Sequence, residues 1–286
     1  MKGWLIINSF MDSDKFANLY EMICHAFKKH QISVIVKTAS NISLEVDEII
    51  DDKPDFAIFW DKDIYLAQRL ERQGIRLFNS AKAVELCDNK ILMYQELAKN
   101  NIRIPKTFIA PKTFEGLGYT KREFLSQVAA RIGFPIVVKE AYGSFGEQVY
   151  LAKDIKSLNE IVNRIGYKDF LMQEFIKESE GKDIRINVVG GRAIVSMLRE
   201  NKNDFRSNIS SGGLGTKFEP EQEYIALAIK AAKALGLSFA GVDVMFGKDG
   251  PIVCEVNSNP QFASTLKATG INLSDYIADY ILRQVC

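Results

Sequence analysis

Residues 241–260, with the sequence GVDVMFGKDGPIVCEVNSNP, constrain the fold more than any other stretch of the chain. The apolar, β-branched runs 242–246 and 252–256 flank a Gly-Lys-Asp-Gly-Pro turn sequence, and this pattern predicts a two-stranded hairpin. The hairpin determines which side chains share a face, because successive residues of a strand point to opposite faces.

The predicted turn also sets the pairing of polar side chains. With the turn centred on Asp249, Asp243 lies opposite Glu255, and Asn257 is a diagonal neighbour on the same face. Two uncompensated carboxylates roughly 5 Å apart repel each other by ~3 kcal/mol at an effective dielectric constant of about 20. A divalent cation would remove this repulsion, and the three oxygen ligands favour magnesium or manganese over zinc.

The alternative is that these carboxylates point into water or pair with Lys or Arg. If the repulsion is present, Asp243→Asn or Glu255→Gln should relieve it and leave the thermal stability of the metal-free protein nearly unchanged. The two interpretations differ in what balances the negative charges.

Length and charge limit the organisation and the partners. A chain of 286 residues exceeds the ~100–200 residues usual for one domain, so we expect two or three lobes with a cleft between them. With 37 Lys and Arg against 36 Asp and Glu, the net charge is +1, and no global field attracts nucleic acid or an anionic membrane. No apolar run approaches the ~20 residues of a membrane span, and the first one is too short for a signal peptide. We therefore expect a cytoplasmic protein with no nucleic-acid or membrane partner.

Cysteine and histidine spacing indicates neither a zinc site nor a disulfide framework. Both histidines, His25 and His30, fall in one amphipathic helical pattern and are expected to be surface or satisfied residues. The four cysteines lack CxxC spacing and are predicted to be free thiols: Cys24, Cys87, Cys254 and Cys286.

The N-terminal part alternates strands and helices, as in a parallel α/β sheet. Strands are expected at 4–7, 32–36, 56–60 and 75–78, and helices at 14–30, 46–50, 64–73 and after Asn79-Ser80. No GxGxxG follows the first strand, so the topology is Rossmann-like without the dinucleotide fingerprint. A helix at 88–101 and a Gly- and Pro-containing loop at 111–119 follow, which places the first domain boundary near residue 88.

A glycine-rich hairpin tip is the candidate anion site. Predicted strands 135–140 and 148–151 are joined by AYGSFGE, in which Gly143 and Gly146 flank Ser144. Glycines let the backbone approach a phosphate, although the absence of Gly-Lys-Ser/Thr excludes a Walker P-loop, and an ordinary glycine hairpin is the alternative. Lys139 ends the Val-rich strand beside this tip, where an ammonium group requires an anion, so we favour a phosphate-binding loop.

A second candidate segment, NDFRSNISSGG, lies in the C-terminal part. Arg206 and Asn208 are two residues apart, so an extended segment would project both to the same side, and the Gly-rich continuation indicates a ligand-approach loop. Regular elements surround it, with strands expected at 170–176, 184–189 and 193–198 and helices at 221–235 and 273–285.

Several motifs occur in a characteristic order: Lys90, Lys139, residues 143–146, Gln173-Glu174-Phe175-Ile176, Asp183-Ile184-Arg185, Phe205-Arg206-Ser207-Asn208, Asp243 and Glu255-Val256-Asn257. This order resembles the ATP-grasp enzymes and, within them, the RimK-type α-L-glutamate ligases and their LysX-like relatives. The resemblance covers nearly the whole chain. It implies an α/β (α+β) ATP-grasp fold with a Rossmann-like domain at 1–88, a central subdomain with a phosphate flap at 89–176, and a C-terminal subdomain with the metal site at 177–286.

The resemblance also assigns roles to individual residues. ATP would lie between two antiparallel sheets, with Arg206 and Lys139 as the catalytic residues and Arg185 and Arg199 as arginines for substrate carboxylate or phosphate. The ATP site would comprise Lys90, Lys139, Gly143, Ser144 and Gly146 at the phosphates, Glu174, Phe175 and Ile176 at the adenine, Asp183 at the ribose, and Arg206 and Asn208 at the phosphates and the acyl phosphate. The ligands of magnesium or manganese, expected as two ions, would be Asp243, Glu255 and Asn257.

The implied activity is ATP-dependent carboxylate–amine ligation, in which ATP phosphorylates a carboxylate and an amine attacks the acyl phosphate. The expected partners are ATP, an amino acid such as glutamate, and a carboxylate acceptor that is small or carried on a protein, and we expect a homo-oligomer, dimer or tetramer. The flap reads GSFGE where the glutamate ligases have a Thr-Gln-Gly version, and Asn259 stands where they often have Ser, so the acid and the amine stay open. Alternatives are a nucleotide-binding module without turnover and another ATP-grasp chemistry, such as a dipeptide ligase or a phosphotransferase.

Overall fold

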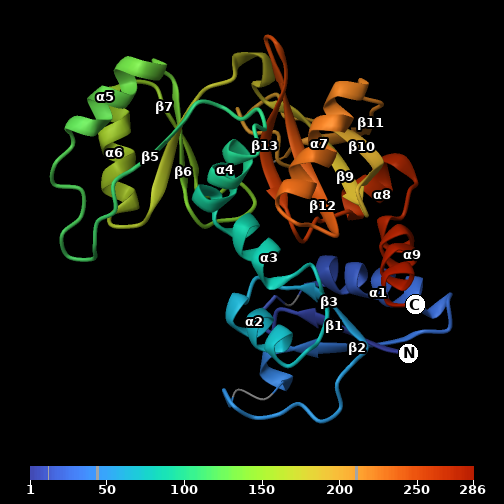
Figure 1. Cartoon of the computed structure of the whole chain (residues 1–286). Helices are drawn as coiled ribbons and strands as arrows, with labels where there is room; N and C mark the ends of the chain where they lie inside the picture. Colours follow the sequence, from blue (N-terminus) through green and yellow to red (C-terminus); the bar gives the residue numbers. More distant parts are fainter. Residues whose placement is uncertain (12, 43–44, 210–211) are drawn as a thin grey trace.

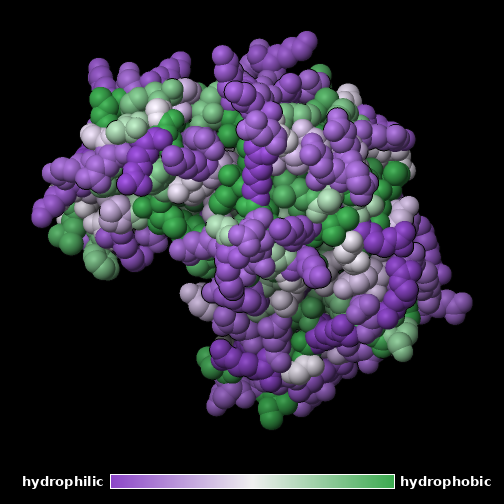
Figure 2. All heavy atoms as spheres, turned by 45° about the horizontal axis from the view of Figure 1, so that its top comes forward, coloured by the Kyte–Doolittle hydropathy of each residue, from purple (hydrophilic) through white to green (hydrophobic). Residues whose placement is uncertain are grey.

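The computed structural model describes residues 1–11, 13–42, 45–209 and 212–286. Their strands form three sheets, with the N-terminal sheet on one side of the molecule and two antiparallel sheets side by side on the other (Figure 1). Hydrophilic side chains cover most of the face seen in Figure 2, and apolar ones appear there in separate patches. No helix among the described residues has both the length and the apolar character needed to cross a bilayer.

The N-terminal sheet is parallel, with the strand order β2-β1-β3-β4. Helices cover both of its faces, and β3 is therefore buried along its whole length, as expected for a parallel sheet. Its elements are β1 (Lys2–Ile7), α1 (Asp14–Lys28), β2 (Ser33–Thr38), η1 (Ala39–Asn41), β3 (Phe56–Trp60), α2 (Ile64–Arg72), β4 (Leu77–Phe78) and α3 (Ala81–Asp88). This arrangement confirms the predicted Rossmann-like topology.

The short helix expected at 46–50 is wrong, because these residues form bends and irregular backbone. Two of its three apolar residues, Val46 and Ile49, are 81% and 68% exposed, and only Ile50 packs against a core. A helix this short needs packing of an apolar face to offset the cost of nucleation, and the two exposed side chains have none.

The central sheet is antiparallel, with the order β5-β8-β6-β7. It has its own apolar core with two helices, and α4 (Lys90–Lys99) lies between it and the large sheet (Figure 1). The elements of this lobe are β5 (Thr107–Ile109), α5 (Glu123–Ile132), β6 (Ile136–Glu140), β7 (Val149–Ala152), α6 (Ile155–Ile165) and β8 (Phe170–Glu174).

The large sheet is antiparallel, with the order β11-β10-β9-β12-β13. Its elements and those that follow the central sheet are η2 (Lys177–Ser179), β9 (Lys182–Val189), β10 (Arg192–Glu200), β11 (Leu214–Lys217), α7 (Gln222–Ala234), β12 (Phe239–Gly247), β13 (Gly250–Asn257), α8 (Ala263–Thr269) and α9 (Leu273–Val285). The hairpin predicted at 241–260 is β12–β13, and Asp243 lies opposite Glu255 as predicted.

The N-terminal sheet and the large sheet share one apolar core. Trp60 at the end of β3 stacks on Phe239 of β12, with ring centroids 5.2 Å apart, and meets Phe262 edge-on. Helix α9, at the far end of the chain, packs on α1 (Figure 1). The three sheets fall within residues 2–78, 107–174 and 182–257, while the domain boundaries at 88 and 176 stay predictions.

Candidate active site

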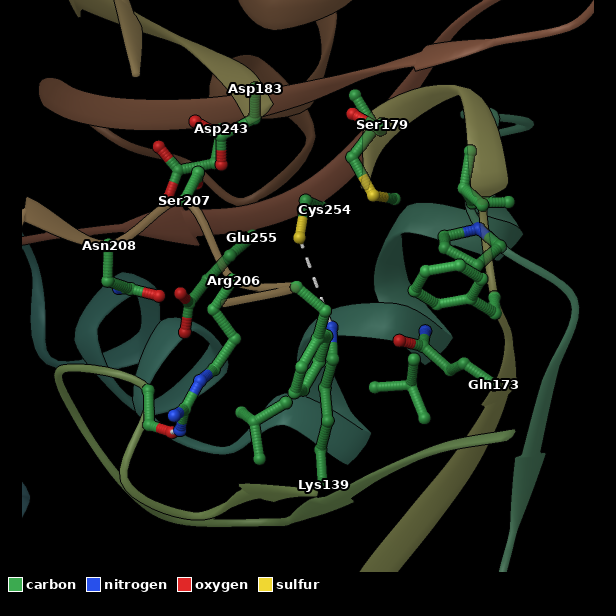
Figure 3. Close-up of a pocket in the computed structure, with 18 of the residues that line it drawn as sticks. Lys139, Gln173, Ser179, Asp183, Arg206, Ser207, Asn208, Asp243, Cys254 and Glu255 are labelled. Atoms are coloured by element: carbon green, nitrogen blue, oxygen red, sulfur yellow. Dashed lines mark hydrogen bonds between the residues drawn. The ribbon is translucent and has the colours of Figure 1, made fainter. Parts of the chain in front are cut away.

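A pocket between the central and large sheets gathers almost every residue singled out in the sequence (Figure 3). Of the residues given a role there, Asn257 and Arg185 are outside its lining, and both line an adjoining cavity instead. The predicted residues in the pocket are Lys90, Lys139, Gly143, Ser144, Gly146, Glu174, Phe175, Ile176, Asp183, Arg206, Asn208, Asp243 and Glu255, together with Arg199.

A β-bulge in β13 places two successive side chains in this pocket. The turn is one residue tighter than predicted, because Gly247 pairs with Gly250. Further along the hairpin, Val244 pairs with Val253 and Asp243 with Glu255, so Cys254 is an extra residue in β13. The bulge restores the pairing of Asp243 with Glu255. It also lets Cys254 and Glu255 both line the pocket, although neighbours in a regular strand face opposite ways.

The large-sheet wall of the pocket carries four alternating charges in contact. Arg199 donates to both oxygens of Asp183, at 2.7 and 2.5 Å, and its Nη2 lies 2.9 Å from Asp243 Oδ2. Arg185 donates through Nε and Nη2 to the two oxygens of Asp243, the second at 2.8 Å. Burial alone would raise the pKa of Asp243, but the two arginines outweigh it and hold that pKa below its ordinary value.

The opposite wall presents a buried lysine without a carboxylate. Lys139, at 7% exposure, donates to the Tyr94 hydroxyl at 3.0 Å and lies 4.0 Å from Cys254 Sγ (Figure 3). Burial raises the pKa of the Cys254 thiol to about 11 and also raises the pKa of Tyr94, so both groups are neutral near pH 7. Among the described residues, no carboxylate comes within 4.0 Å of the Lys139 ammonium.

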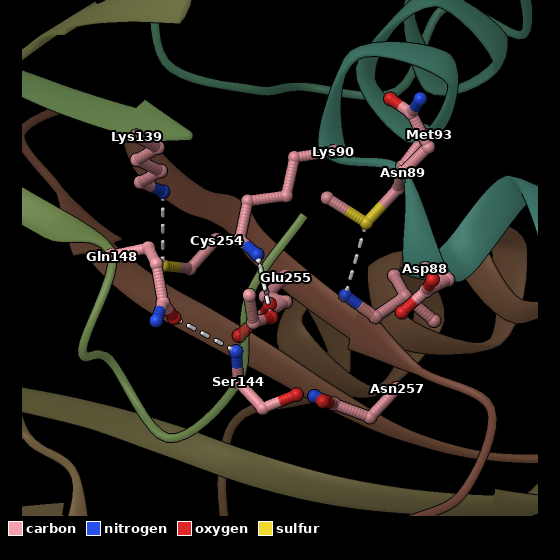
Figure 4. Close-up of polar contacts among 12 residues, drawn as sticks. Asp88, Asn89, Lys90, Met93, Lys139, Ser144, Gln148, Cys254, Glu255 and Asn257 are labelled. Atoms are coloured by element: carbon pink, nitrogen blue, oxygen red, sulfur yellow. Dashed lines mark hydrogen bonds and ion pairs between the residues drawn. The ribbon is translucent and has the colours of Figure 1, made fainter. Parts of the chain in front are cut away.

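Lys90 forms the link between the two walls at the first turn of α4. Its ammonium donates to the Gly143 carbonyl at 3.0 Å and lies 3.6 Å from Glu255 Oε1 (Figure 4). The side chain of Asn89 caps the helix by accepting from the Ile91 and Leu92 amides, which fixes the position from which Lys90 projects.

The glycine-rich loop between β6 and β7 is closed onto the large sheet. Arg206 donates through Nη1 to the Gly146 carbonyl at 2.5 Å, while Asp204 accepts from its Nε and Nη2. Gly146 has φ +79°, and a Cβ there would lie 2.9 Å from Asn208 Oδ1, so this close approach requires glycine. Arg206 and Asn208 share the pocket as predicted, although residues 202–206 form bends rather than an extended strand.

In this closed position the pocket encloses about 120 Å³. That volume is below the roughly 300–1,000 Å³ of typical small-molecule sites. A nucleotide therefore needs more space than the pocket offers in this position.

The three predicted metal ligands differ in the partners that they have in this structure. Glu255 is half-buried beside Lys90, and Asn257 donates through Nδ2 to the Gly241 carbonyl at 3.3 Å, which leaves its amide oxygen as the ligand atom. Asp243 has both oxygens bonded to arginine and could bind a cation only if Arg185 moved. No group of three or more His, Cys, Asp or Glu in the described ranges is arranged to hold a metal, and the predicted set contains only two such residues, Asp243 and Glu255.

Two residues in contact with Lys139 were not identified as site residues from the sequence. Cys254 is one, because the alternation of residues along a regular strand does not reveal a bulge. Tyr94 is the other, because it contacts Lys139 from the middle of α4. At the other end of the pocket Glu174 accepts from the Lys106 amide at 2.7 Å, which fixes the segment that leads to Phe175 and Ile176.

Comparison with known proteins decides the family. A family model described as a RimK-like ATP-grasp domain matches residues 87–281. The chain belongs to the RimK-like ATP-grasp family. This membership confirms the ATP-grasp fold that the sequence motifs predict, and relatives named as a ligase and a synthase support the predicted ligase class.

Individual members of the family match over most of the chain. Human N-acetylaspartylglutamate synthase A is 37% identical over 228 residues, which cover 78% of this chain and 56% of that protein, so the chain spans little more than half the synthase. A probable alpha-L-glutamate ligase of Maridesulfovibrio salexigens is 36% identical over 219 residues, covering 76% of this chain and 70% of that one. The solved RimK domain ATP-grasp protein of Sphaerobacter thermophilus superimposes with a TM-score of 0.76 at 21% identity, covering 98% and 99% of the two chains.

Proposed function

We propose that this RimK-like ATP-grasp protein joins a carboxylate to the amino group of an amino acid, with glutamate as the first candidate, by way of an acyl phosphate. The observation that carries the proposal is Lys139, a buried ammonium whose partners are neutral. A buried cation is costly unless an anion is near, and a nucleotide phosphate would supply that anion. The similarity to proteins named as glutamate ligase and N-acetylaspartylglutamate synthase supports glutamate as the amine.

Each wall of the pocket has a distinct task in this mechanism. Lys139 and Lys90 would hold phosphate oxygens, while the loop at Gly146 would exclude water and Arg206 would stabilise charge on the transferred phosphoryl group. Two ions of magnesium or manganese would be held by Asp243, Glu255 and Asn257. The metal would neutralise negative charge on the phosphates.

Three further assignments belong to the same proposal. The acceptor carboxylate is a small molecule or is carried on a protein. The enzyme is cytoplasmic and forms a homo-oligomer, dimer or tetramer, and light scattering of the purified protein tests the oligomeric state.

The reaction is tested by phosphate release from ATP across a panel of amino acids and carboxylic acids. A ligase of this type should form ADP and phosphate only when a suitable acid is present, and hydroxylamine should trap the activated acid as a hydroxamate. Formation of AMP and pyrophosphate would contradict the mechanism, because those products require an adenylate. ATP binding without product across the panel would favour a nucleotide-binding module.

Arg206→Ala should suppress both phosphate release and hydroxamate, since removal of one group that stabilises transition-state charge costs ~3–4 kcal/mol. Arg192→Ala is the matched control, because Arg192 is exposed at the start of β10 and does not line the pocket. Equal losses in the two variants would remove Arg206 from the mechanism.

A further inference from the structure

A second cavity, of about 440 Å³, adjoins the nucleotide pocket and extends to the N-terminal sheet. Ser144, Arg199 and Glu255 line both spaces, so a molecule in this cavity would reach the site of phosphoryl transfer. The far end of the cavity is formed by the loop after β3 and by the chain that follows β13.

Three acceptor oxygens at this far end are buried and have no hydrogen-bond partner in the described part of the chain. They are Asp61 Oδ2, Asn259 Oδ1 and Gln261 Oε1, and all three residues line the cavity. Asp61 is only 4% exposed, and its other oxygen accepts from Asn8 Nδ2 at 3.0 Å and from the Lys62 amide at 2.7 Å. Asn259 is fixed beside it, because its Nδ2 donates to the Asp61 carbonyl at 2.9 Å.

The cations around the cavity are already paired with other carboxylates. Lys62 lies 2.6 Å from Asp88 and donates to the Ser144 hydroxyl at 3.1 Å. Arg185 and Arg199 are bonded to Asp243, and Arg199 to Asp183 as well. Within the described residues, Asp61 therefore has no ion-pair partner although it is almost completely buried.

We propose that Asp61, with Asn259 and Gln261, binds the protonated amino group of the amino-acid substrate. An ammonium group has three donors and no acceptor, which matches three acceptor oxygens. Water could satisfy those oxygens, but it would not balance the charge of a buried carboxylate, whereas an ammonium would do both. The assignment rests on the proposed ligase function and makes Asp61 a residue that determines the specificity for the amine.

Asp61→Asn tests the charge with little change in volume, and the new amide oxygen can still accept from Asn8 and the Lys62 amide. In the complete enzyme assayed with L-glutamate, the KM for glutamate should rise by about 10- to 100-fold, the loss typical of a charged hydrogen bond, while the KM for ATP stays the same. Asp63→Asn is the matched control: Asp63 lies outside the cavity and caps α2, and Asn caps a helix equally well. An unchanged KM for glutamate in Asp61→Asn would overturn the proposal.

Hydroxylamine separates this proposal from the ligase function itself. Hydroxylamine is neutral near pH 7, so wild type and Asp61→Asn should form hydroxamate at the same rate if Asp61 only recognises an ammonium. Loss of hydroxamate in Asp61→Asn alone would overturn the recognition role, because the residue would then be required without any ammonium.

Calorimetry gives a readout that does not depend on turnover. Wild type should bind L-glutamate more tightly than glutarate, which lacks the amino group, and Asp61→Asn should lose this preference. If neither protein forms hydroxamate but the preference is present and then lost, the binding proposal stands and the ligase function fails. A wild-type protein that shows no preference overturns the binding proposal.

Discussion

The two walls of the nucleotide pocket hold their charges in opposite ways. On the large sheet, Arg185, Asp243, Arg199 and Asp183 alternate in sign and are bonded to one another. On the other wall, Lys139 is equally buried, but its polar partners are the Tyr94 hydroxyl and the Cys254 thiol. On the large sheet, the four charges balance one another without a ligand, and we call this side the paired wall. On the side of Lys139, the lysine wall, the positive charge is not balanced by a neighbouring carboxylate. A phosphate would supply the missing negative charge there.

The largest expected effect is on the paired wall. Asp243→Asn should lower the free energy of unfolding by ~3–5 kcal/mol, because it leaves Arg185 and Arg199 buried without their shared carboxylate. This expectation reverses the one drawn from simple repulsion between Asp243 and Glu255. Urea unfolding followed by circular dichroism measures the loss.

Glu255→Gln is the matched comparison for that variant. The Glu255 side chain is 31% exposed and its nearest cation is 3.6 Å away, so the stability should change by less than ~1 kcal/mol. Equal destabilisation by the two substitutions would show that pairing with the arginines does not make Asp243 more important for stability than Glu255.

The same pairing makes stability depend on pH. The unfolded chain has an ordinary aspartate pKa, whereas the arginines hold the pKa of folded Asp243 lower. The unfolded state therefore takes up a proton first as the pH falls, so the contribution of Asp243 is full above the ordinary aspartate pKa of about 4 and is lost as the pH falls further, through the lower pKa of the folded protein. Urea midpoints across this range should fall more steeply for wild type than for Asp243→Asn, and parallel curves would contradict the assignment.

The lysine wall should respond in ligand affinity instead of stability. Lys139→Met should weaken ATP binding by about 10- to 100-fold and leave adenosine binding unchanged, because the ammonium meets phosphate. The ligand-free protein should keep its stability or gain slightly, since an unpaired buried charge is removed. Calorimetry with both ligands checks this, and the exposed Lys153, in Lys153→Met, is the control. Equal losses for ATP and adenosine would place Lys139 away from the phosphates.

The smallest effect concerns the loop that closes between the walls. Gly146→Ala should lower kcat about five-fold, equivalent to ~1 kcal/mol, because the new methyl group meets Asn208 in the closed position. Gly116 has a similar φ of +82° but open space around its Cβ position, so Gly116→Ala isolates the backbone strain. If both variants lose activity equally, contact with Asn208 has no role.

The candidate site was largely predictable from the sequence because its residues come in short motifs. The pairing of Asp243 with Glu255 was predicted from a turn centred on Asp249. In the structure the turn is tighter, and the extra residue in the β13 bulge brings the same two residues opposite each other. Pairing of Asp243 with Lys or Arg was stated only as an alternative, without naming the partners. Arg185 and Arg199 lie 58 and 44 positions earlier, and they reach Asp243 from the adjacent strand β9 and from β10, one strand further away. Local spacing contains no information about such contacts.

Elements in the N-terminal and large sheets were mostly predicted, while parts of the central lobe were missed. Helix α6 had a usable signal, since Asp154 and Ser157 form a capping box at its start. The packing of α9 on α1 could not be foreseen, because it joins the two ends of the chain. The false helix at 46–50 came from three apolar residues of which two, Val46 and Ile49, are exposed and do not pack on a core.

The loop between β6 and β7 borders both cavities, since Gly143 and Ser144 line each of them. Any ligand that changes the position of this loop at one cavity therefore changes the wall of the other. Nucleotide and second substrate should therefore bind cooperatively, and each should raise the affinity of the other by the same factor, as thermodynamic reciprocity requires. Under the proposal above, this loop would link the binding of ATP to the binding of the amino-acid substrate.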